Sequence, residues 1–195
     1  MSANHAAFNL IFRFVENYVS PIAGRISSQR HVMAIRDGFI SAMPFMIVGS
    51  FLLVFAYPPF SPDTTWGFAR AWLDMAKQFE GQILTPFDMT MGIMSIYICA
   101  AIAYNLGKHY VKSHQLDPFM CAMLSLMAFL LVAAPKTKGT LPVDSLGGTG
   151  IFTAILVAIY CVEMMRFLKA HNIGIRLPDQ VPPMIKNSFD LLIPV

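Results

Sequence analysis

The chain consists of long apolar blocks separated by short polar stretches. Four of these blocks are long enough to cross about 30 Å of hydrocarbon as helices. They occupy residues 38–57, 89–107, 118–135 and 151–168. A further apolar run begins at about Phe189 and reaches the last residue, Val195. We therefore predict an all-α, polytopic transmembrane protein with four spans and the truncated start of a fifth.

A different pattern precedes the first block. Within residues 6–29, apolar side chains recur every three or four positions while polar ones lie between them, which is typical of an amphipathic helix. The apolar positions are Phe8, Ile11, Phe12, Val15, Val19, Ile22 and Ile26. We expect this helix to bend near Pro21 and to lie on the membrane surface. A soluble helix packed on a partner domain is the alternative.

Residues 66–81 mix aromatic side chains with charged ones. This mixture predicts an interfacial helix anchored by its rings, so we do not count it as a span. A tilted span sheltered by neighbouring helices is the alternative. Asp88 comes directly before the second apolar block, and we predict that its carboxylate caps the start of that helix.

Composition supports a membrane protein. Of the 195 residues, 56% are hydrophobic and 13% are charged, whereas soluble domains carry about a quarter charged residues. The three cysteines, Cys99, Cys121 and Cys161, lie inside apolar blocks without paired or metal-type spacing. We interpret them as small buried side chains rather than as a disulfide framework.

Lysine and arginine are distributed unevenly between the two sides of the predicted membrane. With the N-terminus on one side, that side receives Arg13, Arg25, Arg30, Arg36, Lys108, Lys112, Arg166, Lys169, Arg176 and Lys186. The other side receives Arg70, Lys77, Lys136 and Lys138. The bias predicts a cytoplasmic N-terminus. It divides the chain into a cytoplasmic amphipathic segment (1–36), a membrane domain (37–168), and a cytoplasmic Pro-rich connector with the start of the next span (169–195).

Few side chains suggest chemistry. Glu163 precedes Arg166 by three positions near the cytoplasmic end of its block, which predicts an ion pair on one helix face. His109 and His114 fall in the basic stretch "KHYVKSH", which we interpret as a solvated loop. His5, His31 and His171 stand alone in the sequence. The segment "LGGTG" lacks the lysine of a phosphate loop and is interpreted as a helix entry.

Small residues form a stripe in the second apolar block. Ser95, Cys99, Ala103 and Gly107 follow one another four positions apart. Such a stripe lets another helix approach closely, so it predicts a helix-packing seam. The partner is either within the chain or in a second subunit. The sequence shows no nucleophile–base arrangement, zinc pattern or nucleotide motif, so we predict no catalytic residue, no metal, no cofactor and no nucleic-acid partner.

The last segment, "IRLPDQVPPMIKNSFDLLIP", resembles a known family. It is similar to the stretch joining the two halves of the membrane-embedded IIC component in the lactose/cellobiose/diacetylchitobiose family of the phosphoenolpyruvate-dependent sugar phosphotransferase system. The segments "HVMAIRDGFISAMPFMIVGSFLLV", "TMGIMSIYICAAIAYNLG" and "LGGTGIFTAILVAIYCVEMMRFL" resemble the N-terminal spans of that family in the same order. The resemblance runs along essentially the whole chain.

This resemblance implies a sugar permease of the cell membrane. Its N-terminal spans would form a homodimer interface, and its C-terminal half would carry a β-linked disaccharide across the bilayer to a phosphorylated cytoplasmic IIB partner, itself charged by IIA. The family's sugar-contacting histidine and glutamate belong to that C-terminal half. No residue here matches those motifs, so the substrate-binding residues are expected outside these 195 residues.

Two readings of the function follow. In the first, the chain is the N-terminal half of a IIC permease, unable to transport alone because it is a fragment or the product of a disrupted gene. In the second, it is a stand-alone membrane subunit that dimerises or pairs with a full-length permease, or a non-functional remnant. An enzyme acting alone fits the sequence least, and any enzymatic role would belong to the whole phosphotransferase complex.

Overall fold

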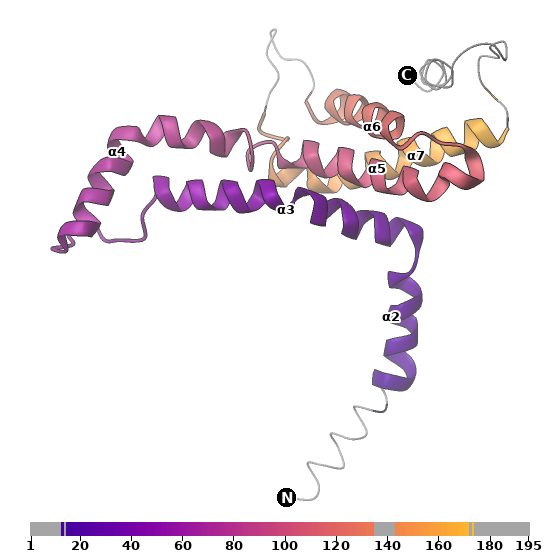
Figure 1. Cartoon of the computed structure of the whole chain (residues 1–195), viewed down its shortest axis with the longest axis horizontal. Helices are drawn as coiled ribbons and strands as arrows, with labels where there is room; N and C mark the ends of the chain where they lie inside the picture. The colour runs from indigo at the N-terminus through magenta and orange to yellow at the C-terminus, as the bar shows by residue number, and fades with distance from the viewer. Residues whose placement is uncertain (1–12, 14, 135–142, 172, 174–195) are drawn as a thin grey trace, which may run out of the picture.

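The computed structural model describes residues 13, 15–134, 143–171 and 173, and every regular element in them is a helix (Figure 1). The elements are a π-helical turn η1 (Val15–Val19), α2 (Ser20–Ser27), α3 (Arg30–Ala56), α4 (Gly67–Asp88), α5 (Met94–His114), α6 (Pro118–Ala133), a 3-10 turn η2 (Gly148–Gly150) and α7 (Ile151–Ala170). The predicted all-α class is confirmed.

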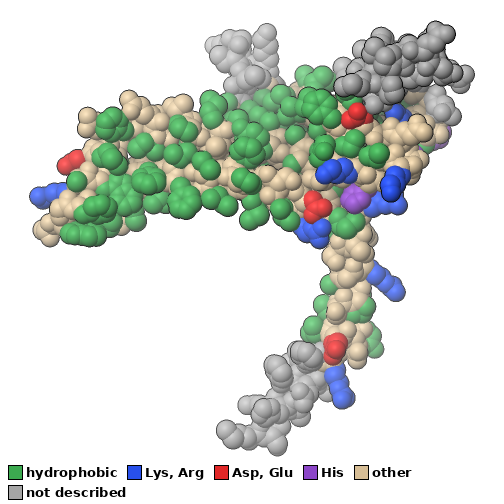
Figure 2. Space-filling view, in the orientation of Figure 1, with side chains coloured by type: hydrophobic (Ala, Val, Ile, Leu, Met, Phe, Trp, Pro, Cys, Tyr) green, Lys and Arg blue, Asp and Glu red, His purple; other side chains and the backbone are tan. Residues whose placement is uncertain are grey.

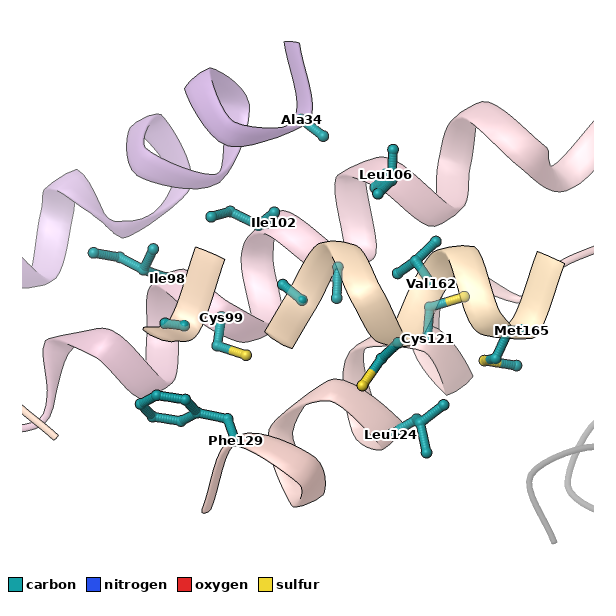
Figure 3. Close-up of a cluster of buried hydrophobic side chains, with 14 of the residues drawn as sticks. Ala34, Ile98, Cys99, Ile102, Leu106, Cys121, Leu124, Phe129, Val162 and Met165 are labelled. Atoms are coloured by element: carbon teal, nitrogen blue, oxygen red, sulfur yellow. The ribbon is translucent and has the colours of Figure 1, made fainter. Parts of the chain in front are cut away.

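Helix α5 lies at the centre of the bundle and packs against α3, α6 and α7. Its side chains Ile98, Ile102 and Leu106 are completely buried (Figure 3). They join buried residues of α6 and α7, such as Phe129 and Val162, in one cluster. The apolar core of this protein is therefore built around a single helix, which the other three surround.

The approach of α3 to α5 depends on a glycine. A Cβ atom placed on Gly38 would lie 2.9 Å from the backbone nitrogen of Ile102 and 3.0 Å from its Cα. Real Cβ atoms do not come this close to backbone atoms, and the backbone cannot rotate away as a side chain can. Gly38 is thus the residue that lets the first long helix rest directly on the central one.

Large apolar side chains cover the outside of the bundle (Figure 2). Exposed examples are Ile47, Phe51, Leu131, Val132, Phe152, Leu156 and Tyr160. Water-soluble monomers rarely expose apolar surface this continuous. Among the described helices, α3 and the segment 148–170 containing α7 are long and apolar enough to cross a membrane, and α6 is a shorter apolar helix.

Two expected boundaries were wrong. Helix α4 continues through Pro86 to Asp88, and α5 begins only at Met94, so Asp88 ends one helix instead of capping the next. The intervening residues form a tight turn, in which a Cβ on Gly92 would lie 2.8 Å from the Cα of Asp88. Helix α4 is also longer than the predicted interfacial helix 66–81, and it bends at Phe79, whose backbone angles are not helical.

The basic stretch "KHYVKSH" is also not a loop, as expected from its charge, but the last two turns of α5. That helix ends at Gln115, which adopts a left-handed conformation with φ of 53°. Asp117 then starts α6, because its side chain accepts hydrogen bonds from the backbone N–H groups of Phe119 at 2.8 Å and Met120 at 3.3 Å. Pro118 occupies the first helical turn, where no backbone donor is needed.

Before the bundle, η1 and α2 form the described part of the predicted amphipathic helix 6–29. The π-helical turn gives way to α-helix directly before Pro21, the residue at which a bend was expected. Three predicted features lie outside the described residues: the helix before position 13, most of the Pro-rich connector, and the start of a fifth span at Phe189.

Candidate functional site

A polar cluster at one end of the bundle joins three helices through Glu163. One carboxylate oxygen of Glu163, in α7, accepts a hydrogen bond from the Tyr110 hydroxyl of α5 at 2.6 Å. The same oxygen lies 2.9 Å from Nε2 of His31 in α3. The other oxygen lies 3.0 Å from the guanidinium of Arg166, one turn along α7. The predicted Glu163–Arg166 ion pair is confirmed and turns out to be the centre of a larger network.

The charges in this cluster share one aromatic ring. Arg166 donates a hydrogen bond to the Tyr110 hydroxyl at 3.0 Å, and its guanidinium carbon lies 5.1 Å from the Tyr110 ring centroid. Arg30, at the start of α3, reaches the same ring at 5.6 Å. Tyr110 is almost completely buried, so the contacts hold its ring and hydroxyl in place. Arg30 and Arg166 thus converge on one carboxylate-bound tyrosine.

Sequence reasoning did not identify Tyr110 as part of this site, and it also missed His31. It stands alone in the sequence, 132 residues before Glu163, and only the packing of α3 against α5 brings its ring to the carboxylate. Because a carboxylate accepts and does not donate, the bond requires a proton on Nε2 of His31. The sequence offered one signal for His31, which was its position. It follows the first residue of the first long helix and lies on the same predicted side of the membrane as Glu163.

Chemically, the cluster is suited to holding helix ends together rather than to catalysis. His31, Tyr110 and Arg166 each bond to Glu163. The described residues contain no group of three His, Cys, Asp or Glu side chains that could hold a metal. A second contact between helix ends involves Lys169, three residues after Arg166. Its ammonium donates a hydrogen bond to the backbone oxygen of Gln115 at 2.9 Å. The end of α7 is thereby joined to the turn between α5 and α6.

The small-residue stripe of α5 is buried inside the chain. Ser95, Cys99 and Ala103 have no exposed surface, and a Cβ on Gly107 would lie 3.0 Å from the Cα of Pro118 in α6. The Cys99 thiol contacts the backbone oxygen of Ser125 in α6 at 3.5 Å. The sequence left open whether the stripe packs on a helix of the same chain or on a second subunit, and these contacts are within the chain.

The segment "LGGTG" forms the other support of this stripe. The Ser95 hydroxyl and backbone N–H both donate to the backbone oxygen of Leu146. A Cβ on Gly150 would lie 2.9 Å from the Ser95 hydroxyl oxygen, so this glycine lets the entry to α7 lie against α5. The segment is a packed helix entry, as its sequence indicated, and its backbone faces α5.

The opposite end of the bundle is aromatic. The Trp72 indole N–H in α4 donates to the backbone oxygen of Phe55 in α3 at 3.2 Å. The Trp72 ring lies 5.7 Å from the rings of Phe55 and Phe60 and 5.9 Å from that of Phe68. Phe55, Phe68 and Trp72, with Ala71 and Met75, line a shallow apolar groove between α3 and α4. These rings hold the end of α3 against the start of α4, and the α4 rings belong to the segment 66–81 that was predicted to be interfacial.

Comparison with known proteins gives consistent results. Residues 36–195 match the family described as "Phosphotransferase system, EIIC". The chain is 36% identical over 198 aligned positions to the PTS system cellobiose-specific EIIC component of Geobacillus stearothermophilus, covering 93% of this chain and 42% of that protein. It is 33% identical to the PTS system lactose-specific EIICB component of Streptococcus mutans, covering 89% of this chain and 30% of the relative.

The fold has a solved counterpart. The crystal structure of the transporter ChbC, the IIC component from the N,N'-diacetylchitobiose-specific phosphotransferase system, aligns with a TM-score of 0.76 at 35% identity. The alignment covers 93% of this chain and 43% of ChbC. The chain thus spans less than half the length of each of these relatives.

Proposed function

The chain belongs to the EIIC family of the phosphotransferase system, and from this we propose that it forms the N-terminal membrane part of a permease for β-linked disaccharides. The substrate class rests on the relatives, whose names specify cellobiose, lactose and diacetylchitobiose. The observation that carries the proposal is the alignment of 93% of this chain with ChbC at a TM-score of 0.76. Both sequence and spatial arrangement therefore favour the same role.

We place α3, α5, α6 and α7 across the bilayer of the cell membrane, with the N-terminus in the cytoplasm. The exposed apolar side chains of α3, α6 and α7 support this arrangement. The Glu163 cluster then lies at the cytoplasmic end, among the arginines and lysines that set the orientation. The aromatic end with Trp72 lies at the opposite interface, where indole rings are favoured.

In this proposal, the chain supplies a fixed frame and does not bind the sugar. The side chains of His31, Tyr110 and Glu163 are engaged with one another at the cytoplasmic end, and the Ser95 hydroxyl is bonded to the backbone of Leu146. The frame would pair with a second copy as a homodimer, with membrane domain 37–168 forming the contact. Sugar-binding residues belong to the complementary C-terminal part, which the relatives contain.

The proposed partners are the cytoplasmic components that phosphorylate the sugar. A IIB protein, recharged by IIA, would act on sugar released at the cytoplasmic side, and one relative carries its B component in the same polypeptide. No catalytic residue is proposed for this chain. Its contribution to the reaction is to hold the moving part of the permease in the membrane.

A chimera tests this division of labour. Residues 1–195 are joined to the complementary C-terminal part of the Geobacillus stearothermophilus cellobiose EIIC component and expressed, with the matching IIA and IIB, in cells lacking cellobiose uptake. We expect phosphoenolpyruvate-dependent cellobiose uptake from the chimera, and none from either part alone, although this chain still inserts into membranes.

Two outcomes would contradict the proposal. Uptake by cells carrying only residues 1–195 would show that the chain transports without the complementary part. A chimera that inserts, folds and remains inactive would show that this chain cannot serve as the frame. A change in transport by a co-expressed full-length permease, together with an inactive chimera, would instead favour the alternative of a membrane interaction subunit.

A further inference from the structure

We propose that η1 and α2 dock on a lipid surface containing anionic headgroups, held there by an aliphatic stripe and by arginines at the cytoplasmic end of the bundle. The inference rests on the proposed function in one respect, because it requires α3 to cross the membrane. Nothing in the sugar chemistry of the permease depends on it.

The first observation is an exposed aliphatic stripe. Every described side chain from Val15 to Ser27 is solvent-exposed, although this segment contains several large apolar residues. Ile22 and Ile26 are 57% and 51% exposed, and Val15 and Val19 are each 45% exposed. These positions follow one another at intervals of three or four, so their side chains lie along one side of the helix. A stripe of this kind requires an apolar partner.

The second observation is the direction of the helix. Ser28 and Gln29 connect α2 to α3, and in Figure 1 α2 turns sharply away from α3 and runs across the long axis of the bundle. The contact of His31 with Glu163 joins the start of α3 to α7. It fixes the α3 side of the bend between α2 and α3, which we call the elbow (residues 25–31). If α3 is parallel to the membrane normal, α2 lies close to the plane of the bilayer surface, as interfacial helices do.

The third observation is charge. Arg25 lies in the last turn of α2, and Arg30 follows at the start of α3. Figure 2 shows further arginines and lysines gathered where α2 leaves the bundle. Among the described acidic groups at this end, Asp37 is paired with Arg36 at 2.8 Å and Glu163 with Arg166 at 3.0 Å. Asp117 accepts hydrogen bonds from the backbone at the start of α6, and Glu16 lies on η1. The elbow is therefore complementary to negative charge.

The positive charge beside the aliphatic stripe also indicates which partner covers it, a second copy of the chain or a lipid surface. A second copy meeting this stripe around a two-fold axis would bring the same net-positive patch of each copy, containing Arg25 and Arg30, into one interface, and two patches of like net charge repel each other. A layer of anionic headgroups offers apolar chains for the aliphatic stripe and phosphates for the arginines. A lipid surface therefore fits both properties, whereas a homotypic contact fits only the apolar one.

A spin label placed on the stripe measures docking in the whole chain. Val19→Cys is labelled in nanodiscs of phosphatidylcholine alone or with one quarter phosphatidylglycerol. The native cysteines do not interfere, because Cys99, Cys121 and Cys161 are at most 2% exposed. With phosphatidylglycerol, we expect the label to become accessible to oxygen and protected from a water-soluble nickel complex. Without phosphatidylglycerol, we expect the docked-to-undocked ratio, that is the ratio of labels in lipid to labels in water, to fall.

Matched variants separate the two contributions. Ile26→Asp, on the stripe, should undock the helix. Gly24→Asp should not, because position 24 is two residues from both Ile22 and Ile26 and so lies on the opposite face of the helix, where a Cβ has no atom within 4 Å. Arg25→Gln should lower the docked-to-undocked ratio about fivefold and remove part of its dependence on phosphatidylglycerol. Arg70→Gln, the same charge change in α4 at the other end of the bundle, should leave the ratio unchanged.

A second label distinguishes failure of this inference from failure of the proposed function. Ile47→Cys, on the outer face of α3, should be in hydrocarbon in both nanodiscs. If that label is in lipid while the label at position 19 stays in water, the chain spans the membrane and the docking proposal is wrong. Equal docking in both nanodiscs, or broadening of the position-19 signal by a neighbouring copy, would also overturn it. A water-exposed label at position 47 would contradict the membrane arrangement itself.

Discussion

The two ends of the helix bundle are held together by opposite kinds of chemistry. At one end, Glu163 connects α3, α5 and α7 through hydrogen bonds to His31, Tyr110 and Arg166. At the other, aromatic rings around Trp72 connect α3 to α4, with a single indole hydrogen bond to the backbone oxygen of Phe55. The first network is ionic and links segments distant in sequence, whereas the second is apolar and links neighbours.

This difference shows how much each end relies on its contacts. The α3–α4 hairpin is connected by a short chain segment, so its ends stay close even when one contact is lost. His31 and Glu163 are separated by 132 positions, and no local connection keeps them together. We therefore expect substitutions at the ionic end to affect the fold more than equivalent changes at the aromatic end.

The largest effect is expected for Glu163→Ala. Removal of the carboxylate leaves His31, Tyr110 and Arg166 without their common acceptor, and Tyr110 is buried. Because the Glu163 side chain is 25% exposed, we expect a loss of about 2 kcal/mol in the free energy of unfolding, below the range for fully buried pairs. A thiol-reactive dye measures it in detergent, since the three buried cysteines react only after unfolding.

Glu80→Ala is the matched control at the aromatic end. Glu80 accepts a hydrogen bond from the Tyr57 hydroxyl at 3.0 Å, but both groups are exposed, so the midpoint of unfolding should hardly change. An equal loss in the two variants would show that the ends do not differ in the way described.

A smaller effect, of opposite sign at the two positions, is expected for two glycine substitutions. Gly38→Ala introduces a Cβ that meets the backbone of Ile102, so α3 must shift away from α5 at a cost of about 1–2 kcal/mol. Gly81→Ala adds a methyl group to α4 where no atom lies within 4 Å, and should stabilise that helix by about 0.5–1 kcal/mol.

The thiol-reactive dye, followed in detergent while the temperature is raised, measures the midpoint of unfolding of both glycine variants. About 1 kcal/mol corresponds to a shift of roughly 2–4 °C in a chain of this size, so the two midpoints should move in opposite directions. Destabilisation by Gly81→Ala would mean that α4 is packed more tightly than the structure shows. An unchanged midpoint for Gly38→Ala would contradict the close contact between α3 and α5.

The smallest effect is expected for Trp72→Phe. The phenyl ring keeps most of the contacts with Phe55, Phe60 and Phe68 but removes the hydrogen bond to the Phe55 backbone oxygen, for a loss of about 0.5–1 kcal/mol. Trp72→Ala, which also removes the ring contacts, should lower the midpoint further. If the two variants are equally unstable, the hydrogen bond and not the aromatic cluster holds this hairpin.

Some features were predictable because they depend on neighbouring residues. The Glu163–Arg166 pair follows from a spacing of three on a helix, and α6 and α7 follow from uninterrupted apolar blocks with nearby start signals. The start of α5 was not predictable, because Pro86 and Asp88 look like a helix start in the sequence but belong to the end of α4. There the tight turn in which Gly92 lies against Asp88, together with the packing of both α4 and α5 on α3, overrides the local signal.

The sequence by itself determined that the chain is helical, rich in exposed apolar segments and similar to EIIC permeases, because composition, block length and motif order are properties of the linear chain. Only the tertiary structure decided that His31 and Tyr110 join Glu163, that Cys99 and Gly107 contact α6 while Ser95 contacts the entry to α7, and that α2 leaves the bundle with its aliphatic stripe exposed. Each of these depends on the packing of α3, α6 and α7 around α5, and contacts between segments so distant in sequence have no local signature.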